Sequence, residues 1–333
     1  MRIRLIFVVW PFIKDFKTDT VREMNLPIKL QLSDEFLLPE EICNYKVDTR
    51  MKQIWAVELD LLSEFIKVCN VHKLRYYLYA GSMLGAVRHK GVIPWDNDID
   101  VIMPREDYNK LLTIGPKVFE KPYYFQNMAT EEGKYIYFYS KLCNSHTTAR
   151  SEEDYAAGQN CGIFIDIFTL DNLPDGNFAR NLHLFRLRTI TKMARFCCPH
   201  TFPAKQGVVK NVKMHLNHLL YYLMGKPSPE SLFCRFNKVA GSYSKKNTKM
   251  CADLGFGYHA NCTWNREDWK QTKEVPFNTI QAIIPVKYDV ILRKQYGDYM
   301  QYPPIDQRQC HEYYDFDAET PYKDYFQRKK MNH

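Results

Sequence analysis

The segment WDNDIDVIMP, residues 95–104, carries an aspartate at every second position, at Asp96, Asp98 and Asp100, inside an otherwise apolar run. Because side chains alternate between the two faces of a β-strand, this spacing predicts an extended segment with all three carboxylates on one face. Carboxylates this close cannot all stay ionised unless cations or hydrogen-bond donors lie between them. The pattern therefore predicts a strand whose acidic face binds a cation.

The cation that this set of ligands favours is Mg²⁺ (or Mn²⁺). Mg²⁺ is a hard ion that prefers carboxylate oxygens and commonly lies between them and a substrate phosphate. Two other interpretations are an acidic loop that caps a helix starting at Pro104 and a calcium-binding turn. The run continues directly into the apolar segment VIMP without a glycine, and it lacks the ligand spacing of an EF-hand loop. These features favour metal-dependent catalysis.

Gly81 and Ser82 precede the aspartates, at the end of an expected strand and the start of an expected helix. Gly81 would let a phosphate approach the backbone closely, and Ser82 is a suitable N-cap. The free N–H groups of residues 82–84 would favour an anion at this helix start. A Gly-Ser pair alone is more often an ordinary turn. Together with the D-x-D segment that follows, it predicts a turn that binds substrate phosphates.

Three basic residues are candidates for further substrate contacts. Arg88 and His89, between the turn and the aspartates, could each neutralise charge on a leaving phosphate, although such residues are as often solvated. Lys141, at the end of YIYFYSK, could contact a phosphate or could equally be an exposed strand end.

Asp166 in GIFIDIF is the best candidate for a third catalytic carboxylate on another strand. A lone acid in a strongly apolar strand is costly unless a metal ion or donors compensate for its burial. Asp171 and Asp175 lie in or beside turn-like sequence, so we expect both at the surface.

The composition indicates a globular protein with reduced thiols. With 333 residues, of which 45% are apolar, the chain can bury the core of one large domain or two coupled ones. Its 10 cysteines include no C-x-x-C pair and no cluster at zinc-ligand spacing. A chain of this size needs no disulfide framework, so the cytoplasm is the predicted compartment.

The N-terminal segment superficially resembles a signal peptide. Arg2 and Arg4 precede the apolar run Leu5 to Ile13, but Pro11 interrupts the run and no small-x-small cleavage site follows. The run is also far shorter than the roughly 20 apolar residues of a spanning helix. We therefore expect residues 1–37 to be an extension that either contacts a membrane or, before Met24, is not native, and no other segment could span a bilayer.

The net charge of +8 is distributed unevenly. Residues 177–250 contain 14 lysines and arginines and a single acid, Glu230, so this segment carries +13 and the remainder −5. One interpretation is a solvated basic face. The other is contact with an anionic partner, either peripherally with the inner face of a membrane or with a phosphorylated polymer. No nucleic-acid-binding motif accompanies the charge, so no nucleic-acid partner is expected.

Hydrophobic periodicity predicts alternating helices and strands, and hence an α/β (α+β) fold. Helices are expected over residues 48–74, 82–89 and 104–112, and strands over 75–81, 98–103, 135–143 and 162–170. We predict four parts: the extension 1–37, a catalytic core 38–176, a basic helical segment 177–250, and a part 251–333 that packs back onto the same domain.

The segment YAGSMLGAVRHKGVIPWDNDIDVIMPREDY resembles the signature of the LicD family, typified by bacterial phosphocholine transferases and with fukutin-like proteins as animal relatives. The segments SKLCNSHTT, GIFIDIFTLDNLPD and YGDYMQYPP agree in the same order. The resemblance runs from about Leu38 to His311 and is weakest over residues 177–250, where substrate choice could be encoded.

The resemblance implies a nucleotidyltransferase-like mixed sheet flanked by helices. It also implies that Gly81 and Ser82 form the phosphate-binding turn. Asp98 and Asp100 match the metal-binding pair, Asp166 the third acid, and Asp96 the acid at the head of the run. The chain departs from the family pattern at Asn97, where aspartate is usual. Since that position faces away from the metal-binding face, activity is expected to survive.

The resemblance further implies metal-dependent transfer of a group such as phosphocholine from a CDP-activated donor to a sugar hydroxyl of a cell-surface glycan or its lipid-linked precursor, with release of CMP. A CDP-ribitol or other polyol-phosphate donor, or nucleotidyl transfer, remains an alternative. So does a non-catalytic glycan- or membrane-binding module on the same fold. A nucleic-acid nucleotidyltransferase is disfavoured by the missing recognition motifs. We expect the YGDYMQYPP segment to fold back onto the catalytic part.

Overall fold

A computed structural model of the chain describes residues 25–150, 154, 158–197, 221–223, 225–310 and 315–331. The predictions for residues 1–24 and for much of the basic segment lie outside these residues. Residues 25–37, which were assigned to the N-terminal extension, lie against the folded body. The Asn144 side chain donates a hydrogen bond to the Pro27 carbonyl at 2.7 Å. The backbone N–H of Leu30 donates to the Asp60 carboxylate at 2.8 Å.

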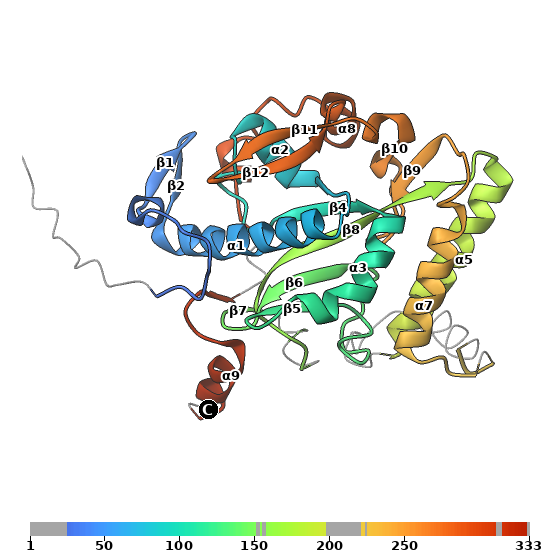
Figure 1. Ribbon diagram of the computed structural model, residues 1–333, viewed down its shortest axis with the longest axis horizontal. Helices are drawn as coiled ribbons and strands as arrows, with labels where there is room; N and C mark the ends of the chain where they lie inside the picture. The colour runs from blue at the N-terminus through green and yellow to red at the C-terminus, as the bar shows by residue number, and fades with distance from the viewer. Residues whose placement is uncertain are drawn as a thin grey trace, which may run out of the picture.

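A seven-stranded mixed sheet forms the centre of the protein (Figure 1). Its longest strand, β8, pairs in parallel with β4 on one side. On the other side it pairs antiparallel with β6 along its first half and with β9 along its last residues. The strands of this sheet are β3 (Tyr77–Leu78), β4 (Asp100–Pro104), β5 (Tyr123–Gln126), β6 (Ser140–Asn144), β8 (Ile163–Leu173), β9 (Met250–Asp253) and β10 (Thr263–Asn265). Since β9 and β10 follow the basic segment, the chain returns to the central sheet after residue 250.

Helices flank this sheet, so the predicted mixed α/β fold is confirmed. They are α1 (Thr49–Val71), α2 (Ala80–Arg88), α3 (Arg105–Val118), α5 (Asn177–Cys197), α7 (Pro229–Ala240), α8 (Tyr288–Tyr296) and α9 (Tyr322–Met331). The long helix α1 begins where the Asp48 carboxylate accepts the Met51 N–H at 2.8 Å, and its apolar residues recur at helical spacing. Within the described residues, no helix has both the length and the apolar content needed to cross a membrane.

In the described part of the chain, three two-stranded sheets accompany the central one. They are the hairpin β1 (Glu40–Ile42) with β2 (Tyr45–Val47), the hairpin β11 (Thr272–Phe277) with β12 (Ile280–Pro285), and the pair β7 (Thr148–Arg150) with β13 (Asp315–Asp317). The β11–β12 hairpin packs against β3 and α2, and the β7–β13 pair links the C-terminal region to the catalytic part.

The buried side chains form two clusters. The larger lies between α1 and the central sheet and includes Trp55, Leu61, Phe65 and Ile165, all essentially inaccessible. The smaller lies where α5 and α7 pack against each other and against the ends of β8 and β9. Burial of each large apolar side chain contributes about 1.5–3 kcal/mol. The helical part of the basic segment is therefore fixed to the sheet by its own core.

The strand predictions differ from the structure mainly in length. The segment predicted at residues 75–81 is extended only at Tyr77–Leu78, and β6 begins at Ser140 rather than at residue 135. Conversely, β8 continues through Leu173, three residues beyond the predicted end, because its second half gains a new partner in β9. That partner lies far away in the chain, so local periodicity could not reveal it.

Candidate active site

Two parallel strands bring the predicted catalytic carboxylates together. Asp100 at the start of β4 is the register partner of Asp166 in β8. The Asp166 N–H donates to the Ile99 carbonyl at 2.9 Å, which fixes this register one residue before β4. Side chains of register partners project to the same face of a sheet. The structure thus places Asp166 beside the D-x-D segment from 66 positions further along the chain.

Burial alternates along the D-x-D segment, although β4 begins at Asp100 and not at Asp98 as predicted. Asp96, Asp98 and Asp100 are half-buried, whereas Asn97 and Ile99 between them are buried. The departure from the family pattern at Asn97 therefore falls on the face opposite the carboxylates. A hydrogen bond also joins the side chains of Asp96 and Asp98.

Asp96 is held against the glycine turn. A Cβ atom added to Gly81 would lie 2.8 Å from Asp96 Oδ2, which is closer than side chains ordinarily approach. The indole N–H of Trp55 donates to the Asp96 carbonyl at 2.9 Å, and the N–H of Asn97 donates to Asp96 Oδ1 at 3.1 Å. Gly81 was predicted to let a phosphate approach the backbone; the group that lies against it is the Asp96 carboxylate.

Ser82 has a different local role from the one predicted. It was expected as the N-cap of the helix, but α2 begins at Ala80 with Tyr79 as its N-cap residue, so Ser82 lies in the first turn. Ala80 has a φ of +45°, a strained value for an L-residue. The buried Ser82 hydroxyl accepts the backbone N–H of Asp100 at 2.8 Å. Ser82 thereby ties the glycine turn to the first residue of β4, and phosphate binding by this turn stays a prediction.

Lys141 belongs to the site and is not an exposed strand end. Every residue of β6 is buried, and Lys141 is the antiparallel register partner of Asp166. Its Nζ atom lies 3.6 Å from Asp166 Oδ1 and 3.2 Å from the centroid of the Phe164 ring. An ion pair of this length leaves Asp166 Oδ1 without a hydrogen bond. Lys141 therefore compensates the charge of Asp166 only in part.

Two further buried acids, Glu58 and Asp253, were not predicted from the sequence. Glu58 of α1 is 1% exposed, and its Oε2 atom has no hydrogen-bond partner in the structure as described. Asp253 of β9 is also buried, and its Oδ1 atom accepts the N–H of Gly255 at 2.9 Å. The burial of Glu58 could have been predicted, because Glu58 falls on the apolar face of α1, four residues after Ile54. Asp253 gave no comparable signal.

Burial and mutual repulsion raise the pKa values of these acids. Burial, followed by the Asp98 carboxylate, raises the pKa of Asp96 and of Asp100 well above the usual range. Burial and then Asp98 likewise raise the pKa of Glu58. Burial raises the pKa of Asp166 to about 6 although Lys141 lowers it. The site is thus a cluster of acids that favours either protonation or a bound cation.

The donor set fits a divalent cation in its chemistry and its burial. Carboxylate oxygens are the ligands that Mg²⁺ prefers. Asp166 Oδ1 is buried and has no hydrogen-bond partner among the described residues, so it could coordinate such an ion. As the described side chains stand, no three His, Cys, Asp or Glu residues are gathered around a single metal position. Asp98, Asp100 and Asp166 would have to turn their carboxylates onto a common point to hold such an ion.

Arg88 and His89 lie beneath the C-terminal segment that was expected to fold back. The Arg88 guanidinium donates to the carbonyls of Tyr299 and Gln301 at 2.8 and 3.3 Å, so the YGDYMQYPP segment does pack onto the catalytic part. Arg88 Nε also donates to His89 Nε2 at 2.9 Å. Burial, then Arg88 and Arg308, lower the pKa of His89 to about 4. His89 is therefore neutral at pH 7, and the role of both residues in substrate binding stays a prediction.

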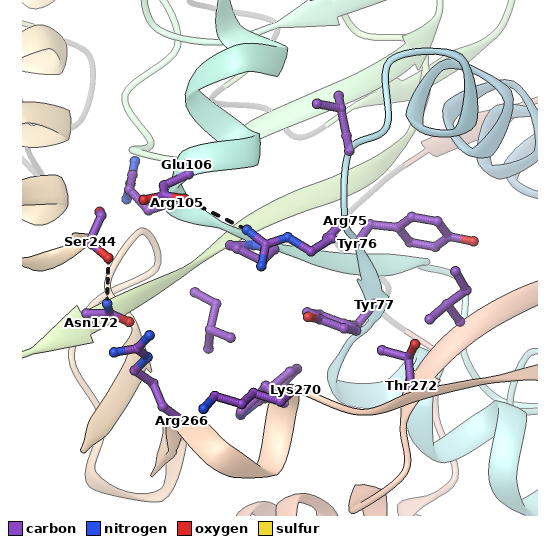
Figure 2. A pocket seen from close by; sticks show the side chains of 15 residues that line it. Arg75, Tyr76, Tyr77, Arg105, Glu106, Asn172, Ser244, Arg266, Lys270 and Thr272 are labelled. Carbon is purple, nitrogen blue, oxygen red and sulfur yellow. Dashed lines mark hydrogen bonds and ion pairs between the residues drawn. The ribbon is translucent and has the colours of Figure 1, made fainter. Parts of the chain in front are cut away.

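A separate hollow of about 370 Å³ lies at the other end of β4, where Pro104 contributes to its wall (Figure 2). Figure 2 shows Arg75 and Lys270 among the side chains around it. Both cations already have carboxylate partners: Arg75 Nε lies 2.6 Å from Asp107 Oδ2, and Lys270 Nζ lies 2.6 Å from Glu267 Oε1. Arg266 also lines the hollow, and its guanidinium donates to the carbonyls of Lys246 and Thr248. The hollow is therefore separate from the carboxylate site.

Asp171 and Asp175 were both expected at the surface, and the expectation for Asp171 is wrong. Asp171 is fully buried in β8 and accepts two hydrogen bonds from Arg105, at 2.6 and 2.7 Å. Thr169 Oγ1 donates to the same carboxylate at 3.0 Å. Asp175 is exposed, as expected. Asp171 thus anchors the start of α3 and does not face the catalytic carboxylates.

Comparison with known proteins defines the class. A sequence model described as the nucleotidyltransferase domain of LicD/FKTN/FKRP matches residues 73–202, which contain every predicted site residue from Gly81 to Asp166. The lipopolysaccharide cholinephosphotransferase LicD of Haemophilus influenzae is 27% identical over 271 residues, which are 80% of this chain and 96% of that protein. An uncharacterised protein of Rickettsia prowazekii is 32% identical over 82 residues, 24% of this chain and 29% of its own length.

Residues 73–202, which match the nucleotidyltransferase domain model, contain the strands β3 to β8 and the paired carboxylates Asp100 and Asp166. The chain is thus similar to LicD family proteins, as its signature segments predicted.

Proposed function

We propose that this chain, a phosphotransferase of the LicD type, transfers a substituted phosphate group such as phosphocholine from a CDP-activated donor to a sugar hydroxyl of a glycan or its lipid-linked precursor, with release of CMP. The observation that carries the proposal is the register of Asp100 with Asp166, which places carboxylates from two strands on one acidic face. The relative from Haemophilus influenzae, whose name states cholinephosphotransferase activity on lipopolysaccharide, supports the choice of transferred group.

Asp98, Asp100 and Asp166 would hold Mg²⁺ (or Mn²⁺), with Asp96 at the head of the set. When bound, such an ion supplies positive charge that offsets the charge developing on the leaving phosphate. The Ser82 hydroxyl positions Asp100 by accepting the backbone N–H of Asp100, and Gly81 leaves room for the Asp96 carboxylate. These contacts orient the acids before substrate arrives, which is the main contribution a protein makes to phosphoryl transfer.

Asp166 or Asp96 would accept the proton of the attacking sugar hydroxyl. A general base works best when its pKa lies near the working pH, and burial brings that of Asp166 to about 6. Lys141 lowers the same pKa and so keeps the carboxylate available at neutral pH. Substrate contacts by Lys141, Arg88 and His89 complete the proposal.

The most specific part of the proposal is the identity of the CDP-activated donor. A choline group requires an aromatic or acidic environment for its quaternary ammonium. Tyr296 of α8 is 43% exposed as a whole residue, whereas desolvation of its hydroxyl group, followed by the charges of Asp100, Asp96 and Asp98, raises its pKa. We assign Tyr296 to the donor side of the site. A CDP-ribitol donor remains the alternative, because a polyol could hydrogen-bond to the same hydroxyl.

A donor panel tests this proposal. Purified protein with Mg²⁺ would be incubated with CDP-choline, CDP-ribitol, CDP-glycerol, CTP or UDP-sugars, and thermal unfolding and CMP release would be recorded. A ligand at about 100 times its dissociation constant stabilises the folded state by roughly 2.7 kcal/mol. We expect one CDP compound to protect selectively, and Asp98→Asn and Asp100→Asn to lose both protection and CMP release.

The exposed Asp175 supplies the matched control, since Asp175→Asn removes an acid outside the site. Full CMP release by either site variant would refute the assignment of the carboxylates. If no nucleotide gave metal-dependent protection, the non-catalytic binding module would become the better interpretation.

A further inference from the structure

Helix α5 exposes a stripe of large apolar side chains to solvent. Phe178, Leu182 and Phe185 are 83%, 49% and 65% exposed. Their spacing of four and then three residues places them on one face of the helix, one above the other. The opposite face already packs against α7 through buried residues such as Leu184 and Leu187. The helix is therefore apolar on two faces, of which the residues that the structure describes cover only one.

An uncovered stripe of this kind is unusual for a helix that already has a core-facing side. Single exposed apolar residues are normal on protein surfaces, but a contiguous set marks a surface that binds something. Burying each of these side chains would release about 1.5–3 kcal/mol, so the stripe favours any partner that removes it from water.

The charges around the stripe decide which partner fits. Arg186, Arg188 and Lys192 are exposed on the same helix, and residues 177–197 contain no aspartate or glutamate. An apolar stripe flanked by cations is the pattern of helices that lie in the interface of an anionic membrane, with apolar side chains below the headgroups and cations among the phosphates. A second copy of the chain would instead bring arginine-rich faces together, which repulsion disfavours.

We propose that the outer face of α5 docks on an anionic lipid surface, with Phe178, Leu182 and Phe185 inserted between headgroups and with Arg186, Arg188 and Lys192 against lipid phosphates. This goes beyond the proposed reaction and does not depend on the identity of its donor. The charge of the basic segment alone left a solvated face open as an explanation; the exposed stripe on α5 favours the membrane.

The position of α5 relates the docking face to the reaction site. Figure 1 shows α5 and α7 together at the edge of the molecule, beyond the end of β8. Asp166 lies seven positions before Leu173, the last residue of β8, which at about 3.3 Å per residue is roughly 23 Å of extended strand. A lipid-linked acceptor would thus reach the carboxylates through its glycan part, while its lipid stays in the membrane below α5.

Vesicle co-sedimentation of the full chain tests the proposal. Phosphatidylcholine vesicles would be compared with vesicles containing 30% phosphatidylglycerol, at about 0.1 M and 0.5 M salt. We expect binding to the anionic vesicles to be at least tenfold stronger, and to weaken at high salt because the Debye length shortens to a few ångströms. The triple variant Phe178→Ser, Leu182→Ser, Phe185→Ser should lose at least tenfold in binding, and Arg186→Glu with Arg188→Glu should lose the preference for anionic lipid.

The control is Val71→Ser at the end of α1, where an equally exposed apolar side chain (76%) lies outside the stripe. The stripe variants should unfold at the same temperature as the parent and keep their CMP release with the donor identified above, which separates this test from that of the reaction. Equal vesicle binding by parent and stripe variant would overturn the proposal, and so would absence of binding to anionic vesicles. A dimer in light scattering that the triple variant dissociates would assign the stripe to a second copy instead.

Discussion

Substitution of Gly81 by alanine should displace the Asp96 carboxylate without lowering the stability of the protein. The added Cβ would lie 2.8 Å from Asp96 Oδ2, whereas ordinary contacts begin at 3.4 Å, so the carboxylate must retreat by about 0.6 Å. The obstructing atom is the end of a side chain, which can rotate away. Alanine also favours a helical position over glycine by up to about 1 kcal/mol. We therefore expect Gly81→Ala to unfold at the same temperature as the parent or slightly above it.

The same substitution should reduce activity strongly. Catalytic groups must stay within about 0.5 Å of their productive positions, and a displacement of about 1 Å can lower the rate roughly 100-fold. A shift of this size in Asp96, which is hydrogen-bonded to Asp98, should lower kcat/KM about 10- to 100-fold.

Thermal unfolding and CMP release of the same preparation would check both halves of this prediction. Gly176→Ala is the matched control, because nothing lies within 4 Å of the Cβ position at Gly176 and the change should leave activity intact. Parental activity in Gly81→Ala would show that the position of Asp96 is unimportant. A large loss of stability would show that the helix start, and not the carboxylate, requires glycine.

Three further predictions concern buried charge. Asp171→Asn leaves the Arg105 guanidinium buried without its carboxylate, so chemical denaturation should show a loss of about 3–5 kcal/mol. Glu58→Gln should raise the melting temperature at pH 8 more than at pH 4, because the raised pKa of Glu58 makes the native state hold a proton that the unfolded state releases; an unchanged difference between the two pH values would contradict this. Mg²⁺ should stabilise the protein more at pH 8 than at pH 5, because protons compete with the metal ion for Asp166, whose pKa is raised from 3.8 to about 6. Without metal, the free energy of unfolding should fall as the pH rises from about 4 to about 6, because the native state holds a proton that the unfolded state releases. Titration of the melting temperature with Mg²⁺ at both pH values checks this, and equal shifts would argue against metal binding at Asp166.

The similarity to the LicD family and the alternating burial of the D-x-D segment were both predictable from the sequence. The alternation of Asp96, Asp98 and Asp100 with buried residues follows from the geometry of an extended chain alone. The long helix α1 and its Asp48 cap were equally local, since periodicity and capping involve residues only a few positions apart.

Local sequence was misleading wherever a partner came from elsewhere in the chain. Ser82 has the composition of an N-cap, but its hydroxyl accepts the N–H of Asp100. Asp171 appeared to belong to a turn, but β8 continues through it because β9 and Arg105 are there to pair with it. Arg88 appeared free to meet a phosphate, yet carbonyls more than 200 positions later accept its hydrogen bonds.

The sequence by itself thus determined the alternating carboxylates on which the proposed chemistry rests, because the identity and spacing of three acids are local properties. Only the tertiary structure decided which groups share the site. The parallel register of β4 with β8 adds Asp166, the packing of α1 adds Glu58, and the return of β9 adds Asp253. It also decided which faces of α5 are covered. These outcomes depend on contacts between distant segments, whose free energies local periodicity does not encode.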